Sequence, residues 1–139
     1  MCFTFLKSQG YEIGASLCED EFLNTASKLL QSSDGKKIIL PVDFGVSNDI
    51  LSSSRVDKPL ELIESTDIGV DIGSKSVALF NEIIHTSNTI FWNGPMGVFE
   101  NKSFEYGTRE ITKSVSQSNA YTVVGGGCLL YTSPSTRDE

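Results

Sequence analysis

Two short apolar segments, each running directly into a glycine-rich turn, constrain the fold more than any other feature of the sequence. Residues 89–92 lead into Asn-Gly-Pro-Met-Gly-Val-Phe-Glu, which ends at Glu100, and residues 120–124 lead into three consecutive glycines at 125–127. Apolar residues at helical spacing between them predict a helix over about 103–116. A strand–helix–strand unit favours parallel strands whose turns open at the same edge of the sheet. Ligands of such sheets lie beyond the carboxyl ends of the strands, so the sequence predicts a phosphate or nucleotide site at this edge.

The turn after residue 92 has a composition that suits a close approach of backbone to another group. Gly94 and Gly97 permit contacts that a Cβ would block, and Pro95 stiffens the turn. A tight strand-to-helix turn without a ligand has the same composition and is the alternative interpretation. The second glycine turn favours the ligand site, because two such turns are expected to meet at one edge.

The rest of the chain alternates helical and extended patterns, which predicts an α/β fold with a parallel sheet. Asp43 follows one expected strand and is either a functional or a turn-stabilising carboxylate, and the sole histidine, His85, ends an expected helix. The expected elements begin with a helix over 1–9 and a helix that starts at a Ser16–Glu19 capping box and buries Phe22, Ala26, Leu29 and Leu30. A buried strand over 37–40 and an irregular or weakly paired segment over 45–60 are expected next. The last of these elements is a helix that follows the turn at 70–75 and buries Val77, Phe80, Ile83 and Ile84.

Composition limits the classes of function that the chain can have. Its 139 residues suit a single domain, and 39% hydrophobic and 21% charged residues are ordinary for a soluble globular protein. No apolar run reaches the length of a membrane span, so no membrane partner is expected. A net charge of −7 argues against non-specific nucleic-acid binding, but backbone N–H groups can still hold a nucleotide phosphate on an acidic protein. The three cysteines are an odd number and lack the spacing of a disulfide framework or a metal site, which indicates free thiols in a reducing compartment.

The segment Trp92-Asn-Gly-Pro-Met-Gly-Val-Phe-Glu100 resembles the signature of the phosphoglycerate kinase family. The resemblance covers about residues 1–127, in the family's order and spacing. It includes Phe3-Thr-Phe-Leu-Lys-Ser-Gln-Gly10, Leu40-Pro-Val-Asp43, Asp71-Ile-Gly73, Gly107-Thr108 and Val124-Gly-Gly-Gly127. It implies a three-layer, parallel-sheet (Rossmann-like) nucleotide-binding α/β domain that is incomplete at both ends. Residues 1–127 would then be part of the C-terminal, nucleotide-binding domain of a two-domain enzyme.

The resemblance also implies an activity for the parent protein. Phosphoglycerate kinases move a phosphoryl group between 1,3-bisphosphoglycerate and ADP, giving 3-phosphoglycerate and ATP in glycolysis. The expected ligands are ATP or ADP with Mg2+, and 3-phosphoglycerate would bind through an N-terminal domain that this sequence lacks. The parent is expected to be a cytoplasmic monomer, and the fragment alone to be inactive. The alternatives are a non-catalytic nucleotide-binding or regulatory module on the same fold and a purely structural α/β domain.

Positions that match the family's motif carry expected roles in nucleotide binding. Glu100 matches a glutamate that accepts hydrogen bonds from the ribose hydroxyls, as an ionised carboxylate can. Asn93 matches an asparagine near the phosphate chain. Pro95 and Val98 resemble residues that wall the adenine and ribose pocket, and Gly69 aligns with a glycine whose backbone meets the nucleotide. The match assigns no catalytic residue and no metal ligand.

The sequence departs from the family's pattern after the last glycines. Gly126 and Gly127 match the start of a phosphate- and metal-binding turn, but Cys128 stands where the family has an aspartate that approaches magnesium. A neutral thiol is a poor ligand for this hard cation. Residues 128–139 contain Pro134 among small polar residues and show no helical periodicity, so we expect them to be a non-native tail.

Overall fold

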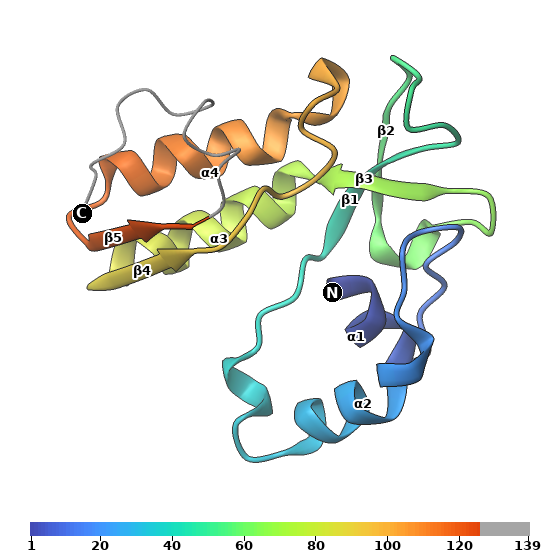
Figure 1. Cartoon of the computed structure of the whole chain (residues 1–139), viewed down its shortest axis with the longest axis horizontal. Helices are drawn as coiled ribbons and strands as arrows, with labels where there is room; N and C mark the ends of the chain where they lie inside the picture. The colour runs from blue at the N-terminus through green and yellow to red at the C-terminus, as the bar shows by residue number, and fades with distance from the viewer. Residues whose placement is uncertain (126–139) are drawn as a thin grey trace.

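The computed structural model describes residues 1–125, which form helices, short strands and turns (Figure 1). The helices are α1 (Cys2–Ser8), α2 (Leu23–Gln31), α3 (Ser74–Thr86) and α4 (Tyr106–Gln117), with short 3-10 turns at Asp20–Phe22, Gly35–Lys37, Leu60–Leu62 and Lys102–Phe104. The strands are β1 (Asp43–Ser47), β2 (Val56–Pro59), β3 (Ile68–Ile72), β4 (Thr89–Trp92) and β5 (Tyr121–Val124). Within the described residues, no helix has both the length and the apolar character needed to span a bilayer.

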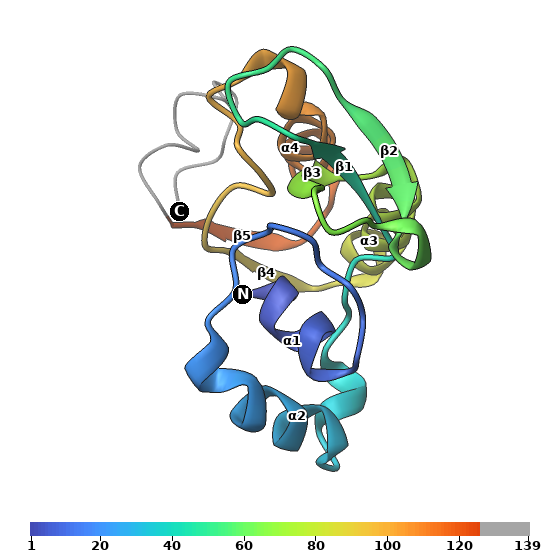
Figure 2. The same ribbon diagram turned by 90° about the vertical axis from the view of Figure 1, so that its right-hand side faces the viewer.

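The strands form two separate sheets. One has three antiparallel strands in the order β2-β1-β3, and the other is a parallel pair, β4 and β5. In the parallel pair the register runs from Thr89 opposite Tyr121 to Trp92 opposite Val124, so both strands end level with each other. Figures 1 and 2 show α3 and α4 lying beside this pair, while α1 and α2 lie together in another part of the molecule.

Two clusters of buried apolar side chains form the core. The first joins α1 to β1 and the turn before β3, and consists of Leu6, Ile13, Phe44, Val46, Leu60 and Ile63. The second lies between α3, α4 and the parallel pair, and consists of Ile72, Val77, Trp92, Ile111 and Val115. Because the second cluster includes Trp92 at the end of β4, it fixes the point from which the predicted ligand loop departs.

Several sequence predictions are confirmed. The helices expected near residues 1–9 and 103–116 are present as α1 and α4. The helix expected after 70–75 is present as α3, but the turn is shorter than expected, because β3 extends to Ile72 and α3 begins at Ser74. The apolar residues at helical spacing within 103–116, Phe104, Ile111 and Val115, are buried. The strands at 89–92 and 120–124 are parallel neighbours. The chain is therefore an α/β protein with a small parallel sheet.

The buried strand predicted for residues 37–40 is wrong. A 3-10 turn ends at Lys37, the next residues pair with no strand among residues 1–125, and Ile39 is 46% exposed. An extended segment becomes a strand only when a neighbour satisfies its backbone groups. Apolar character alone does not supply that neighbour.

The segment over 45–60, expected to be irregular or weakly paired, has more regular structure than expected, because β1 and β2 pair there in antiparallel fashion. The signal was weak because β2, Val-Asp-Lys-Pro, is an edge strand with mostly exposed side chains. The three-stranded sheet also departs from the expectation of parallel strands throughout. Its strands are joined without crossover helices, so they can run antiparallel.

The capping box predicted at Ser16–Glu19 is wrong as well. The Ser16 hydroxyl instead accepts a hydrogen bond from the Gly69 backbone N–H at 2.8 Å, and α2 begins only at Leu23. Of the residues expected to be buried on this helix, only Ala26 is fully buried. The Ser16 hydroxyl therefore binds β3 and does not cap the helix, as the local sequence had predicted that it would.

Candidate functional site

The loop formed by residues 93–101 leaves the end of β4 beside the end of β5. The Gly125 N–H donates to the Trp92 carbonyl at 2.7 Å, and a Cβ at Gly125 would lie 3.2 Å from Asn93 Oδ1. The beginning of the second glycine turn thus lies next to Asn93, as the sequence predicted. Gly126 and Gly127 fall outside the described residues.

Two backbone hydrogen bonds fasten the middle of this loop to the fold. Met96 N–H donates to the Thr108 hydroxyl of α4 at 3.0 Å, and Val98 N–H donates to the Val70 carbonyl of β3 at 2.9 Å. Gly97 lies so close to β3 that an added Cβ would collide with the Val70 carbonyl. Gly94 has no atom within 4 Å of that position. Close approach within the protein therefore explains Gly97 but not Gly94.

The carboxyl end of the loop is held by a side chain. Asn101 donates from Nδ2 to the carbonyls of Ile50 and Ser52, at 3.0 and 2.8 Å. Its Oδ1 accepts from the Ser103 N–H at 3.0 Å and so caps the turn at Lys102–Phe104. This single amide joins the 93–101 loop to the loop between β1 and β2.

The structure brings together some of the predicted binding residues. Gly69 and Val98 both lie beside Val70, Gly69 as its chain neighbour and Val98 through the backbone hydrogen bond. The Gly69 N–H is already donated to Ser16, and the Phe3 ring occupies the space where a Gly69 Cβ would point. Sequence reasoning missed these two neighbours of Gly69, which come from distant parts of the chain.

The other predicted residues lie along the exposed side of the loop. Asn93, Pro95 and Glu100 are exposed, whereas Val98 is half-buried. Within residues 1–125, no hydrogen bond or ion pair holds the Glu100 carboxylate. Open polar groups on a fastened backbone can bind a ligand without first breaking contacts inside the protein.

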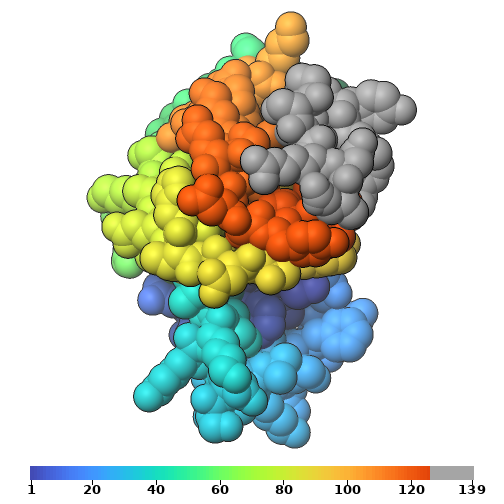
Figure 3. Space-filling view, turned by 90° about the vertical axis from the view of Figure 1, so that its left-hand side faces the viewer, coloured from blue at the N-terminus to red at the C-terminus, as the bar shows by residue number. Residues whose placement is uncertain are grey.

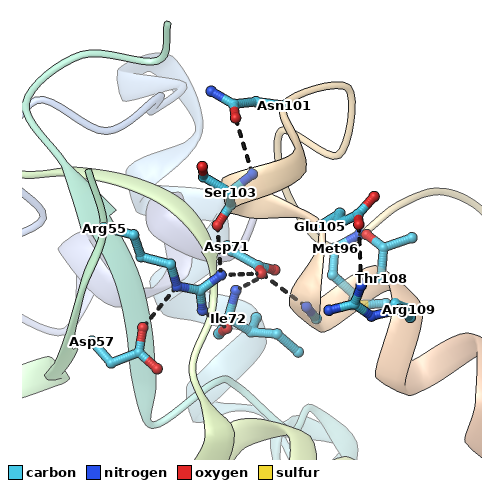
Figure 4. A network of polar contacts seen from close by, with 11 residues as sticks. Arg55, Asp57, Asp71, Ile72, Met96, Asn101, Ser103, Glu105, Thr108 and Arg109 are labelled. Atoms are coloured by element: carbon cyan, nitrogen blue, oxygen red, sulfur yellow. Dashed lines mark hydrogen bonds and ion pairs between the residues drawn. The ribbon is translucent and has the colours of Figure 1, made fainter. Parts of the chain in front are cut away.

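A buried ion pair between Arg55 and Asp71 lies next to the part of β3 on which the loop docks (Figure 4). Arg55 Nη1 donates to Asp71 Oδ2 at 2.6 Å, and the Gly107 N–H donates to the same oxygen at 2.8 Å. Arg55 Nη2 donates to the Ile72 carbonyl at 3.0 Å, while Arg55 Nε pairs with Asp57 at 2.8 Å. One guanidinium therefore connects β2, β3 and the start of α4.

Burial and hydrogen bonds shift the pKa values of both members of this ion pair. Burial raises the pKa of Asp71, while the hydrogen bonds from Gly107 and Arg55 act in the opposite direction. Burial alone would lower the pKa of Arg55, but its hydrogen bonds to Asp57 and Asp71 raise it. The guanidinium also lies 5.5 Å from the centre of the Tyr106 ring, within the range of a cation–π contact. No local pattern of residues indicated this network, because Arg55 lies in the segment expected to be irregular or weakly paired.

Asp43 has a structural role. Its carboxylate accepts hydrogen bonds from the N–H groups of Lys75 and Ser76, at 3.0 and 2.8 Å, and from the Ser76 hydroxyl at 2.6 Å. It is 5% exposed and satisfies free N–H groups at the start of α3. The turn-stabilising interpretation is therefore confirmed, and His85 lies exposed at the other end of α3.

Fold and site together define an α/β protein that presents a fastened, partly polar loop at the carboxyl ends of two parallel strands. A family model described as "Phosphoglycerate kinase" matches residues 1–133. The chain therefore belongs to the phosphoglycerate kinase family.

Individual relatives agree with this assignment. The chain is 47% identical over 128 residues to a protein named phosphoglycerate kinase from Salinispora tropica, and 47% identical over 131 residues to one from Finegoldia magna. Each alignment covers 91% of this chain but only 32% and 33% of those relatives, so the chain spans about a third of their length.

Solved structures give the same result. The structure of phosphoglycerate kinase from Coxiella burnetii matches with a TM-score of 0.87 and 38% identity, covering 94% of this chain and 34% of that one. The enzyme from Pyrococcus horikoshii matches with a TM-score of 0.78 and 25% identity, covering 99% of this chain and 36% of that one.

Proposed function

We propose that the parent protein is a phosphoglycerate kinase that transfers a phosphoryl group reversibly between 1,3-bisphosphoglycerate and ADP, giving 3-phosphoglycerate and ATP in glycolysis. The observation that carries this proposal is the family match, together with the placement of the Trp92–Glu100 loop beside the end of β5. The chain spans about a third of its relatives, so it would supply part of the nucleotide site only.

The exposed loop suits the binding of a nucleotide. In our proposal Glu100 accepts hydrogen bonds from the ribose hydroxyls, and Asn93 lies near the phosphate chain. Pro95 and Val98 wall the pocket, and the open space around Gly94 leaves room for a ligand to approach the backbone. Phosphoryl transfer depends mainly on positioning and on neutralising charge, which a glycine-rich backbone site can support.

Glycine backbone from two neighbouring segments would complete this site. We propose that Gly69 borders the nucleotide through its backbone, although its N–H is already donated to Ser16. We propose that Gly126 and Gly127, which lie outside the described residues, also border the phosphates.

Magnesium would enter with the nucleotide as Mg-ADP or Mg-ATP. Among residues 1–125, no group of three or more potential metal ligands lies together. At Cys128 the chain offers a thiol where the family has a carboxylate. These residues do not fit a protein-held magnesium, so we propose that the nucleotide phosphates hold the ion.

We further propose that residues 1–127 are part of the C-terminal domain of the parent, a three-layer parallel-sheet domain, and that residues 128–139 are non-native. The family match continues past Cys128 to residue 133, so the tail needs a direct test. The genomic reading frame provides it: if that frame encodes residues 128–139, the tail is native. The parent is proposed to be a monomer of the cytoplasm.

Calorimetry of the purified chain with Mg-ADP tests the binding role. We expect heat of binding for the wild-type chain and weaker binding for Glu100→Ala, with an unchanged melting temperature because Glu100 is exposed. Absence of binding heat, or an effect of Glu100→Ala on stability alone, would favour a purely structural domain. We expect no ATP formation from 1,3-bisphosphoglycerate and Mg-ADP, because the chain spans about a third of its relatives and, in our proposal, supplies only part of the nucleotide site.

A further inference from the structure

Glu100 owes its position to its neighbours, since no described residue holds its carboxylate. On its amino side, Val98 is fastened to β3 through the Val70 carbonyl. On its carboxyl side, Asn101 is the next residue, and the Asn101 N–H also closes a turn by donating to the Val98 carbonyl at 3.1 Å. The side chain of Asn101 therefore controls one of the two attachments that bracket Glu100.

The Asn101 side chain contacts a loop that is itself held in place. Residues 48–55 join β1 to β2, and Asn101 donates to two carbonyls near the start of this loop. At its end, Arg55 forms the buried pair with Asp71 and also reaches the Ser103 carbonyl at 3.5 Å. The loop is therefore fastened to the region around residues 101–107 at both ends.

The chemistry of the contact requires a carboxamide. One amide supplies two N–H donors and one acceptor oxygen, and Asn101 uses both kinds of group. A hydroxyl or a carboxylate could keep the cap on Ser103, but neither has the two N–H donors needed for the Ile50 and Ser52 carbonyls. A substitution at Asn101 can thus keep the hydrogen bond from the Ser103 N–H while removing those to the Ile50 and Ser52 carbonyls.

We propose that Asn101 is a positioning residue that sets where Glu100 meets the ribose of a bound nucleotide, by bridging the 93–101 loop to the 48–55 loop. This inference rests on the proposed function of Glu100. Asn101 does not touch the nucleotide in this proposal. It acts by keeping the Glu100 backbone in one place, so that the carboxylate does not have to be ordered at the moment of binding.

The first test needs no ligand. Asn101→Ser keeps an oxygen for the Ser103 N–H and removes both N–H donors, leaving a single O–H on a shorter side chain. Asn24→Ser, at an exposed position of α2, is the matched control. We expect hydrogen exchange at the Val98 and Asn101 amides to be about fivefold faster in Asn101→Ser, as for the loss of about 1 kcal/mol. Unchanged exchange at both amides would overturn the proposal.

The second test compares Mg-ADP with the magnesium complex of 2′,3′-dideoxy-ADP, which lacks the ribose hydroxyls. We expect Asn101→Ser to lose most of the wild-type preference for ADP, as Glu100→Ala does, while Asn24→Ser retains it. Equal weakening of both nucleotides would show a merely structural role and would overturn the proposal. If Asn101→Ser does not fold, Asn101→Asp replaces it, because it also keeps the acceptor and removes the donors.

The two measurements separate this inference from the proposed function. If the wild-type chain binds neither nucleotide, the proposed function fails for this chain, and so does the ribose half of the inference. The exchange rates still decide whether Asn101 holds the loop.

Discussion

At the scale of single residues, the two glycines of the 93–101 loop have different surroundings. A Cβ at Gly97 would lie 2.8 Å from the Asp71 Cα and even closer to the Val70 carbonyl, both of them backbone atoms of β3. A Cβ at Gly94 would meet open space, and Gly94 has no positive φ. One glycine thus permits the loop to dock on β3, while the other leaves space beside Asn93.

The first prediction follows from this difference. Gly97→Ala should destabilise the chain by about 1–3 kcal/mol, as overpacking against backbone does, whereas Gly94→Ala should change stability by less than about 0.5 kcal/mol. Urea denaturation followed by Trp92 fluorescence measures both. Equal stability of the two variants would show that the loop can shift away from β3 at little cost.

Gly94→Ala also provides a test at the level of binding. If a nucleotide approaches the backbone here, the added methyl group should weaken Mg-ADP binding without altering the unfolding curve. Titration calorimetry on the folded variant gives the answer. Unchanged affinity would show that the open space around Gly94 does not face the ligand.

At the scale of elements, Lys58 of edge strand β2 forms an ion pair with the turn that leads into β3. Lys58 donates to Asp67 Oδ2 at 2.8 Å, and the Glu64 N–H donates to the same oxygen at 2.9 Å. Burial tends to raise the pKa of Asp67, but the hydrogen bonds from Lys58 and Glu64 outweigh it and lower that pKa. The hydrogen bond to Asp67 raises the pKa of Lys58.

These shifts predict a pH dependence. Because the folded pKa of Asp67 is lowered, its contribution is present above the unfolded value of about 3.9 and is lost as the pH falls through the folded pKa. The folded pKa of Lys58 is raised, so the contribution of Lys58 to stability is present below its unfolded pKa of about 10.4 and is lost as the pH rises through the folded pKa. Asp67→Asn should therefore lower stability at pH 7, and its difference from the wild type should shrink as the pH falls through the lowered, folded-state pKa of Asp67. A difference that stays constant from pH 7 down to the acid unfolding of the wild type would contradict the assignment to this ion pair.

The elements also show how far the sequence alone can lead. The helices α3 and α4 were predictable, because most of their apolar positions pack into one core, although Ile83 of α3 is 40% exposed. The strands β4 and β5 were predictable because each is a short apolar run. The β1–β2 pair was not predictable. Backbone hydrogen bonds join β1 to Val-Asp-Lys-Pro of β2, whose side chains are mostly exposed and therefore show no apolar pattern. Residues 37–40 show the reverse case, in which apolar side chains lack a strand partner within the described part of the chain.

The candidate site was predictable in part for a related reason. Asn93, Gly97 and Glu100 belong to one contiguous motif, so their proximity follows from the chain itself. The supporting contacts connect residues far apart in sequence: Asn101 reaches Ser52 across 49 positions and Gly69 reaches Ser16 across 53. No local pattern of residue types encodes such pairings.

At the scale of the whole molecule, one surface remains apolar and open. Ile39, Ile83 and Phe91 are 46%, 40% and 67% exposed, and they line a groove of about 380 Å³ between α3, α4 and β4. Figure 3 shows the yellow residues of α3 and β4 at the surface, above the cyan segment that precedes β1. The edge of β4 that faces away from β5 pairs with no strand among residues 1–125.

An open strand edge beside apolar side chains favours self-association. We predict that the isolated chain forms oligomers at micromolar concentration, and that Phe91→Lys reduces their proportion. Leu62→Lys, at a 63% exposed position on another surface, is the matched control and should change nothing. Sedimentation velocity over a range of concentrations measures the distribution. A monodisperse monomer at all concentrations would refute this prediction.

The buried Arg55–Asp71 pair also affects how the sequence can change. A Cβ at Gly45 would lie 2.5 Å from the guanidinium, and a Cβ at Gly107 would collide with the Asp71 carboxylate. Because Gly45 and Gly107 have no side chains, they leave the space that the Arg55 and Asp71 side chains occupy. In a library that randomises Gly45, Arg55, Asp71 and Gly107, the clones that fold should change these positions together, because a change at one of them alone removes either a charged partner or the space that the partner occupies.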